Sequence, residues 1–348
     1  MKFNHESHVT AWFSAIIVSM EITPNPPIIP FGEEKIYTPL KNKFLETGRS
    51  GKNQWWRYLV GIVIVFIGGY SLLGQIPILF LAFWGMKKGY INQFDPDLQT
   101  KLLNPAIMHV DPNLMLLIEL FIFVGAMFSL WIVVRFIHRK KFISIITSAP
   151  KIRWKRFAIT AVIWMILCFA GQFVSLMMYP DNYTVVFNIK PFLITLLIGI
   201  IFLPIQTWWE EYFFRGYLFQ GIGQLTKTPL VPIIVTGTLF GLVHMANPEV
   251  AAYGVANMLP AYVMPGLFLA MMAALDEGLE SAMGMHFANN LFGTFAVTSS
   301  SSAIQANTIW LAKGMNPGAD NLTLLFSFII LMTILWKTNK WDFTKLYR

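Results

Sequence analysis

Cysteine and charge are both scarce in this 348-residue chain. The single cysteine, Cys168, excludes intrachain disulfides, a haem-attachment pair and a cysteine-based zinc site. Charged residues make up 13% of the chain, against roughly 25% in soluble domains, whereas hydrophobic residues make up 55%. The few charges are separated by long runs that water would not solvate. We therefore expect an integral membrane protein rather than a soluble enzyme.

Long apolar runs dominate the chain after residue 57. About 20 apolar residues cross the hydrocarbon layer, and backbone groups in lipid must bond internally, so each run is expected to be a helix. Pro77 in the first run predicts a kink or a partly re-entrant segment. The sequence thus predicts an all-α polytopic protein with about eight transmembrane helices, from the runs Tyr58–Met86, Leu114–Val134, Phe157–Pro180, Pro191–Trp209, Thr228–Pro248, Val250–Leu275, Ser281–Ala312 and Asn321–Trp336.

The two ends of the chain are expected to lie outside the membrane domain. Residues 1–57 contain only one apolar stretch, Val9–Met20, which is too short to span a bilayer, and they lack a strongly basic segment before it. We interpret residues 1–57 as a cytosolic or interfacial extension without an assigned role. Residues 58–337 then form one membrane-embedded helical domain, and residues 338–348 form a cytosolic tail.

The net charge of +8 is explained by orientation rather than by nucleic acid. With a cytosolic N-terminus, seven Lys and Arg precede the first span, eight separate the second and third spans, and four follow the eighth, whereas five lie on the opposite side. This bias follows the positive-inside rule. We predict a multi-pass protein in contact with the lipid bilayer, with both termini cytosolic, and short loops favour a bacterial cell membrane.

Six ionisable residues lie within the apolar runs or in the apolar stretch that continues the run Pro191–Trp209, where charge is costly and usually functional. Glu211 and Arg215 are four residues apart with the acid first, which is the favourable order for a helical ion pair. Glu210 points about 100° away and has no cation nearby on its own helix, so it is a candidate general base. A buried ion network that only holds helices together is the alternative. The six are Glu119, Glu210, Glu211, Arg215, His244 and His286.

His244 and His286 occur in two further runs, each with small residues on nearby turns. Asn290 follows His286 by one turn and shares its helix face. Gly237 and Gly241 form a GxxxG spacing that predicts close helix packing. Each histidine alone is typical of an interhelical hydrogen bond, but together with Glu210 the two histidines predict a polar cavity inside the bundle.

Three motifs in this order resemble the CPBP family, the CAAX-protease and bacteriocin-processing family of intramembrane endopeptidases, also called ABI. The motifs are E-E-x3-R at 210–215, F-x3-H from Phe240 to His244, and H-x3-N from His286 to Asn290. Gly216 continues the first motif as the family does. The resemblance covers a core of about residues 191–297, and no motif residue departs from the pattern.

The resemblance implies hydrolysis of a peptide bond within the membrane, in a membrane-associated or hydrophobic peptide or protein. Glu210 and His244 would activate a water, His286 and Asn290 would stabilise the oxyanion, and Glu211 with Arg215 would support the site. Because the family carries a metalloprotease label, zinc held by Glu210, His244 and His286 is an open alternative.

Other chemistries are less consistent with the sequence. The H-E-x2-H motif of zinc site-two proteases is absent, and no apolar run contains the aspartates of aspartyl intramembrane proteases. Two alternatives stay open. One is a noncatalytic scaffold or bacteriocin-immunity protein with the same architecture, and the other is a proton-coupled transporter that uses Glu119 with Glu210 and His244.

Several polar or aromatic residues carry no catalytic assignment. We expect a packing role for Glu119, and either an interface belt or cavity lining for Trp208 and Trp209. An acidic turn on the cytosolic side is interpreted as a solvated loop, with recognition of a basic peptide near the site as the alternative. Four histidines are assigned solvated positions without a role. The turn residues are Asp276, Glu277 and Glu280, and the histidines are His5, His8, His109 and His138.

Overall fold

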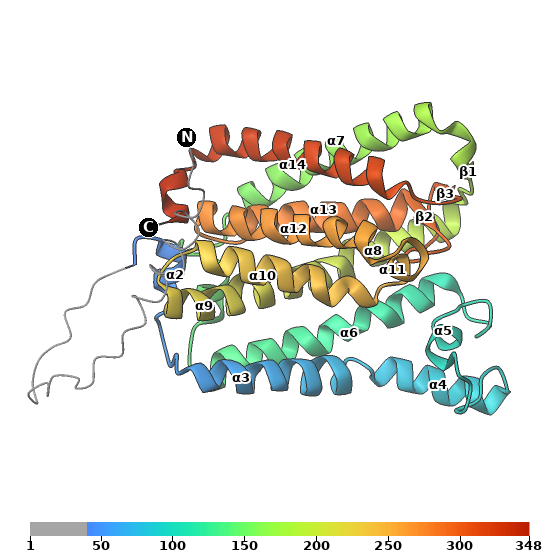
Figure 1. The fold of residues 1–348 in the computed structure, drawn as a ribbon. Helices are drawn as coiled ribbons and strands as arrows, with labels where there is room; N and C mark the ends of the chain where they lie inside the picture. The colour runs from blue at the N-terminus through green and yellow to red at the C-terminus, as the bar shows by residue number, and fades with distance from the viewer. Residues whose placement is uncertain (1–39, 348) are drawn as a thin grey trace, which may run out of the picture. The chain divides into compact units, whose positions relative to one another are not determined.

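All eight apolar runs contribute to helices in the computed structural model, which describes residues 40–347. His5, His8 and the stretch Val9–Met20 lie outside the described residues. Within residues 40–347, six helical segments are long and apolar enough to cross a membrane: Trp55–Lys88, Pro112–Ile137, Trp154–Met178, Ile189–Thr226, Val255–Asp276 and Pro317–Asn339. Two shorter helices, α10 and α13, pack among them (Figure 1). The predicted all-α polytopic membrane fold is confirmed.

The helices run roughly along one direction of the bundle, and shorter elements join them at the two ends (Figure 1). The principal elements are α2 (Lys43–Thr47), α3 (Trp55–Val63), the π-helix η1 (Ile64–Leu73), α4 (Ile76–Lys88), α5 (Leu98–Leu102), α6 (Pro112–Ile132), η2 (Val133–Ile137), η3 (Phe142–Ile145), α7 (Trp154–Met178), η4 (Pro180–Asn182), α8 (Ile189–Glu211), the π-helix η5 (Tyr212–Leu218), α9 (Phe219–Thr226), α10 (Leu230–Val243), η6 (His244–Ala246), α11 (Pro248–Tyr253), α12 (Val255–Asp276), α13 (Glu280–Phe295), α14 (Pro317–Asn339) and η7 (Phe343–Leu346).

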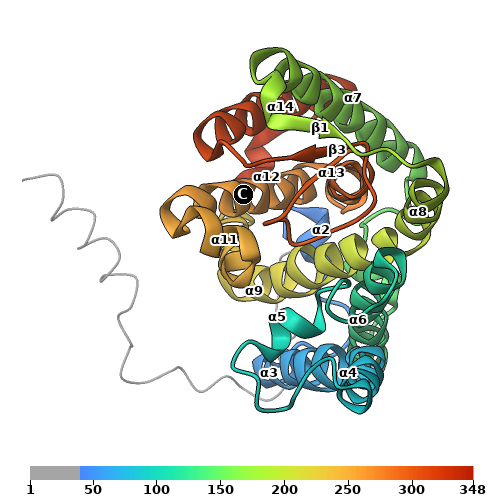
Figure 2. The ribbon, with the colours of Figure 1, turned by 90° about the vertical axis from the view of Figure 1, so that its right-hand side faces the viewer.

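The seventh apolar run is only half helical. α13 ends at Phe295, and the rest of the run forms strands β2 (Val297–Ser299) and β3 (Trp310–Ala312) with a loop between them. The serine-rich stretch after Thr298 has low helix propensity because serine hydroxyls compete for backbone groups. β3 pairs in parallel with β2 and antiparallel with β1 (Tyr183–Val185), in the order β1-β3-β2, at one end of the bundle (Figure 2).

Close packing of α10 against α12 depends on glycine. A Cβ atom at Gly237 or at Gly241 would overlap atoms of α12, including Gly266 and Val263. A Cβ atom at Gly266 would in turn overlap the Gly237 backbone. The small-residue spacing therefore brings the two backbones together as predicted.

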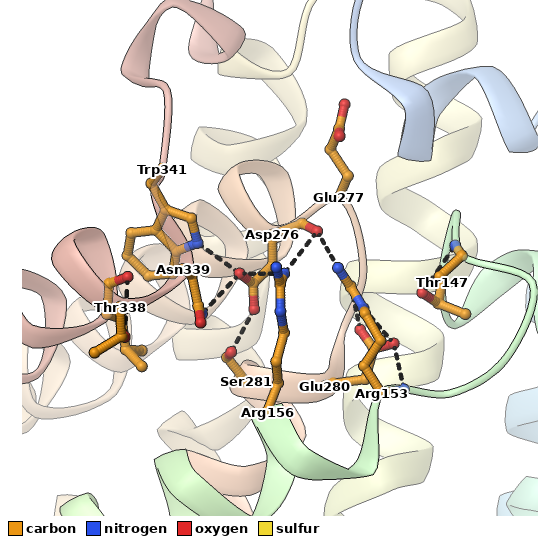
Figure 3. A network of polar contacts seen from close by, with 12 residues as sticks. Thr147, Arg153, Arg156, Asp276, Glu277, Glu280, Ser281, Thr338, Asn339 and Trp341 are labelled. Atoms are coloured by element: carbon orange, nitrogen blue, oxygen red, sulfur yellow. Dashed lines mark hydrogen bonds and ion pairs between the residues drawn. The ribbon is translucent and has the colours of Figure 1, made fainter.

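The acidic turn between α12 and α13 is buried, so the expectation of a solvated loop is wrong. Asp276 accepts hydrogen bonds from Arg156 and from the indole of Trp341, and both Glu280 oxygens accept from Arg153 (Figure 3). Arg153 directly precedes α7, Arg156 lies in its first turn, and Trp341 follows α14. The sequence places the partners more than 60 residues from the acids, which is why local charge counting missed them.

Residues 40–57, part of the expected extension, pack onto this same end of the bundle. The compact unit begins at Leu40. Phe44 and Leu45 in α2 are buried, and the side chains of Gln220 and Gln224 donate to their backbone carbonyls. The helix bundle and this segment therefore share one core.

His138 is buried in this region rather than solvated. Its Nδ1 donates to the Lys52 carbonyl at 2.8 Å, and its Nε2 accepts from the Tyr217 hydroxyl at 2.9 Å. Acceptance by Nε2 requires the neutral imidazole. Burial lowers the pKa of His138 to about 4, and burial also lowers the pKa of nearby Lys140 to about 8. His109, by contrast, is exposed as expected.

Candidate functional site

The centre of the bundle holds a charged cluster at the junction of α8 and η5. Glu210 and Glu211 end α8, and Arg215 lies in η5, a π-helical segment of a kind that is frequent at functional sites. Arg215 Nη1 donates to Glu211 Oε1 at 2.9 Å, and Nη2 donates to the Gly266 carbonyl at 3.1 Å. Glu211 and Arg215 are fully buried, so the predicted ion pair is confirmed in a water-poor environment.

His286 on α13 lies between the two glutamates. Its Nδ1 is 2.7 Å from Glu211 Oε1, and its Nε2 is 3.6 Å from Glu210 Oε2. Because an ionised carboxylate only accepts hydrogen bonds, Nδ1 must carry a proton. Residues that are 75 positions apart in the sequence therefore meet at one point. The predicted association of the first and third motifs is present in the structure.

His244 directly follows α10 and begins η6, and it has no hydrogen bond to the charged cluster. Its Nδ1 donates to the Phe240 carbonyl at 2.6 Å, which leaves Nε2 of the neutral ring as an acceptor. The Phe240 ring links the two histidines, with centroids 4.4 Å from His244 and 5.8 Å from His286. The Arg215 guanidinium also lies over Phe240, at 4.2 Å. Phe240 is thus the spacer around which the motifs are arranged.

A relay of side-chain amides orients Asn290. The Trp164 indole donates to Asn289 Oδ1 at 3.2 Å, and Asn289 Nδ2 donates to Asn290 Oδ1 at 3.2 Å. Since the Asn290 oxygen accepts this bond, its amide nitrogen is the group left to donate elsewhere. Sequence reasoning missed Trp164 and Asn289, because only Asn290 has the spacing that places it on the His286 face.

Unpartnered polar atoms concentrate around Glu210. Six of the ten buried side-chain nitrogen and oxygen atoms without a hydrogen bond in the described residues lie between positions 206 and 215. Buried polar atoms normally have partners, because leaving them unpaired costs free energy. Water or a peptide group could supply these partners. The six atoms are Gln206 Oε1, Trp208 Nε1, Trp209 Nε1, Glu210 Oε2, Glu211 Oε2 and Arg215 Nε.

The aromatic residues before Glu210 do not form an interface belt. Trp209 is buried among Tyr70 and Phe123, and Trp208 packs against Trp154 and Phe157. Both tryptophans therefore form apolar walls beside the acids. Glu119 on α6 is half-buried and has no hydrogen bond or ion pair among residues 40–347, so its packing role stays a prediction.

The three residues considered as zinc ligands do not fit a metal site. Within the described part of the chain, no group of three His, Cys, Asp or Glu side chains is arranged to hold a metal ion. The Nδ1 bonds of His244 and His286 leave both Nε2 atoms available as ligands. However, no hydrogen bond or ion pair in the described residues joins His244 to Glu210 or, through a nitrogen, to His286. The zinc alternative is therefore not supported by this geometry.

Comparisons with known proteins agree with the motifs. The family model described as "Type II CAAX prenyl endopeptidase Rce1-like" matches residues 190–292, which contain the whole cluster. The "Uncharacterized protein YyaK" of Bacillus subtilis (strain 168) is 33% identical over 254 residues, which cover 73% of this chain and 81% of that protein. No solved structure matches the chain significantly.

Proposed function

Because the chain belongs to the Rce1-like family of type II CAAX prenyl endopeptidases, we propose that it hydrolyses a peptide bond in a membrane-associated or hydrophobic peptide or protein. The observation that carries this proposal is the position of His286 between Glu210 and Glu211, where one oxygen of each acid accepts no hydrogen bond from the described residues. A purely structural ion network would be expected to saturate these atoms.

The proposed reaction uses water as the nucleophile. Two atoms 3.6 Å apart, Glu210 Oε2 and His286 Nε2, can both contact one water at about 2.8 Å from each. Glu210 takes a proton from that water, and the water oxygen attacks the scissile carbonyl carbon. His244 Nε2 shares in this proton transfer. The proton then passes to the amide nitrogen as the carbon–nitrogen bond breaks.

Negative charge on the carbonyl oxygen would be stabilised by the Asn290 amide and by Nε2–H of His286 in its protonated form, since Nδ1–H already donates to Glu211. Such preorganised donors are worth several kcal/mol in a site that excludes bulk water. Glu211 and Arg215 take no proton in this scheme. They hold the ring of His286 and join η5 to α12 through Gly266.

We also propose the cell membrane of a bacterium as the location, with both termini cytosolic. The Lys and Arg bias of the sequence supports this orientation. In the structure, α2 and η7 lie at the same end as the buried α12–α13 turn, through contacts of Lys43 and Lys345 with Glu277. Substrates would enter from the bilayer or its surface.

Comparative peptidomics tests the proposed function. Membranes containing wild-type protein should release peptides that are lost with Glu210→Gln, which preserves side-chain volume but removes the base. Glu119→Gln is the matched control, since it neutralises an acid in another span that has no hydrogen bond or ion pair with the cluster, and its peptide profile should equal wild type. Identical profiles for wild type and Glu210→Gln would refute an endopeptidase and favour a noncatalytic protein.

A further inference from the structure

We propose that Tyr262 on α12 is a positioning residue for His244, an inference that rests on the proposed function. The two rings are stacked, with centroids 4.9 Å apart and planes 22° from parallel. Tyr262 belongs to none of the three motifs. It lies one turn before Gly266, whose carbonyl accepts from Arg215, so the same stretch of α12 contacts both halves of the site.

The Tyr262 ring is itself fixed from two directions. Asn247 Nδ2 donates to the Tyr262 hydroxyl at 3.0 Å, and that hydroxyl donates to Glu249 Oε2 at 3.3 Å. Glu249 Oε1 in turn accepts from the Ala303 backbone N–H at 2.6 Å. The ring is therefore tied to the segment that follows His244 and to the loop between β2 and β3.

This arrangement determines which way the free nitrogen of His244 points. The bond from His244 Nδ1 to the Phe240 carbonyl sets the tautomer of His244. The stacked Tyr262 ring limits rotation of the imidazole about the side-chain bonds of His244. A base that is misplaced by about 1 Å can lose a hundredfold in rate. Loss of the Tyr262 ring should thus lower kcat through orientation, with little effect on substrate binding.

The test uses the full-length protein in liposomes with an internally quenched peptide that ends in a farnesylated CAAX sequence. Tyr262→Leu and Tyr262→Met should each lower kcat at least about tenfold, while KM changes less than about twofold. Tyr262→Phe, which keeps the ring, should restore kcat to within about fivefold of wild type. The unfolding temperature of each variant is compared with that of the wild type to show that the variant is folded.

Tyr253→Leu is the matched control. The Tyr253 hydroxyl accepts from Ser301 and from the Met315 backbone, so this variant also loosens the loop after β2, but Tyr253 makes no ring contact with His244. Its kcat should stay near wild type. Three outcomes would each overturn the positioning role. Tyr253→Leu could lose as much kcat as the Tyr262 variants, or Tyr262→Leu or Tyr262→Met could fold and keep a normal kcat. Alternatively, Tyr262→Leu and Tyr262→Met could both unfold. Cleavage that persists in Glu210→Gln would instead overturn the proposed function and this inference together.

Discussion

The buried polar cluster around Asp276 and the one around Glu210 differ in how completely their atoms are partnered. At the α12–α13 turn, both oxygens of Asp276 and of Glu280 accept hydrogen bonds, and the partners come from α7, α13 and the segment after α14 (Figure 3). At the α8–η5 junction, each glutamate has an oxygen without a hydrogen bond.

This difference separates structural from chemical roles. A saturated buried network holds elements in one arrangement and offers no atom to a ligand. A cluster whose protein atoms do not saturate one another leaves donors and acceptors available to water or to a substrate. We infer that the turn around Asp276 fixes the start of α13, and that the fixed helix then presents His286 and Asn290 to the site.

The largest expected effect comes from the buried ion pair of the catalytic cluster, Glu211 with Arg215. Arg215→Met should lower the free energy of unfolding by about 3–5 kcal/mol, because it leaves the buried charge of Glu211 without its cation. Unfolding by SDS in mixed micelles measures the change. The control Arg135→Met removes an exposed cation and should cost less than about 0.5 kcal/mol. Equal stabilities for Arg215→Met and wild type would contradict a buried pair.

A smaller effect is expected at His138, which belongs to the structural end of the bundle. Burial lowers its pKa to about 4 in the folded protein, so the unfolded chain binds a proton first as the pH falls below about 6.5. Its stabilising contribution is complete above pH 6.5 and declines toward pH 4. Between pH 7 and pH 5 the loss should be about 2 kcal/mol.

Unfolding curves at the two pH values measure this loss. His138→Gln should remove it, because the amide does not titrate, whereas His109→Gln at an exposed position should leave it unchanged. A wild-type protein that is equally stable at pH 5 and pH 7 would show that His138 is solvated in the fold.

Local spacing predicted much of the site, because it depends on contacts within one helix. The Glu211–Arg215 pair follows from a separation of one helical turn, and the α10–α12 approach follows from Gly237 and Gly241. The number of apolar runs likewise predicted the fold class, since bilayer thickness fixes the length of each helix.

Contacts between distant elements could not be predicted in this way. The burial of Asp276 depends on Arg156 and Trp341, and the orientation of His244 depends on Tyr262, none of which stands at a helical spacing from its partner. The strands β2 and β3 also escaped prediction, because an uncharged run has the same hydropathy whether it continues a helix or caps the bundle.

One paired measurement tests most directly whether the Glu210 cluster is catalytic and the Asp276 cluster structural. It compares the cleavage rate and the free energy of unfolding of Glu210→Gln and Glu280→Gln. We predict that Glu210→Gln lowers cleavage at least about a hundredfold with stability within about 1 kcal/mol of wild type. Glu280→Gln should lower stability by about 2–3 kcal/mol while the folded protein cleaves within about fivefold of wild type. The reverse pattern, an active Glu210→Gln protein and an inactive but fully stable Glu280→Gln protein, would contradict the account.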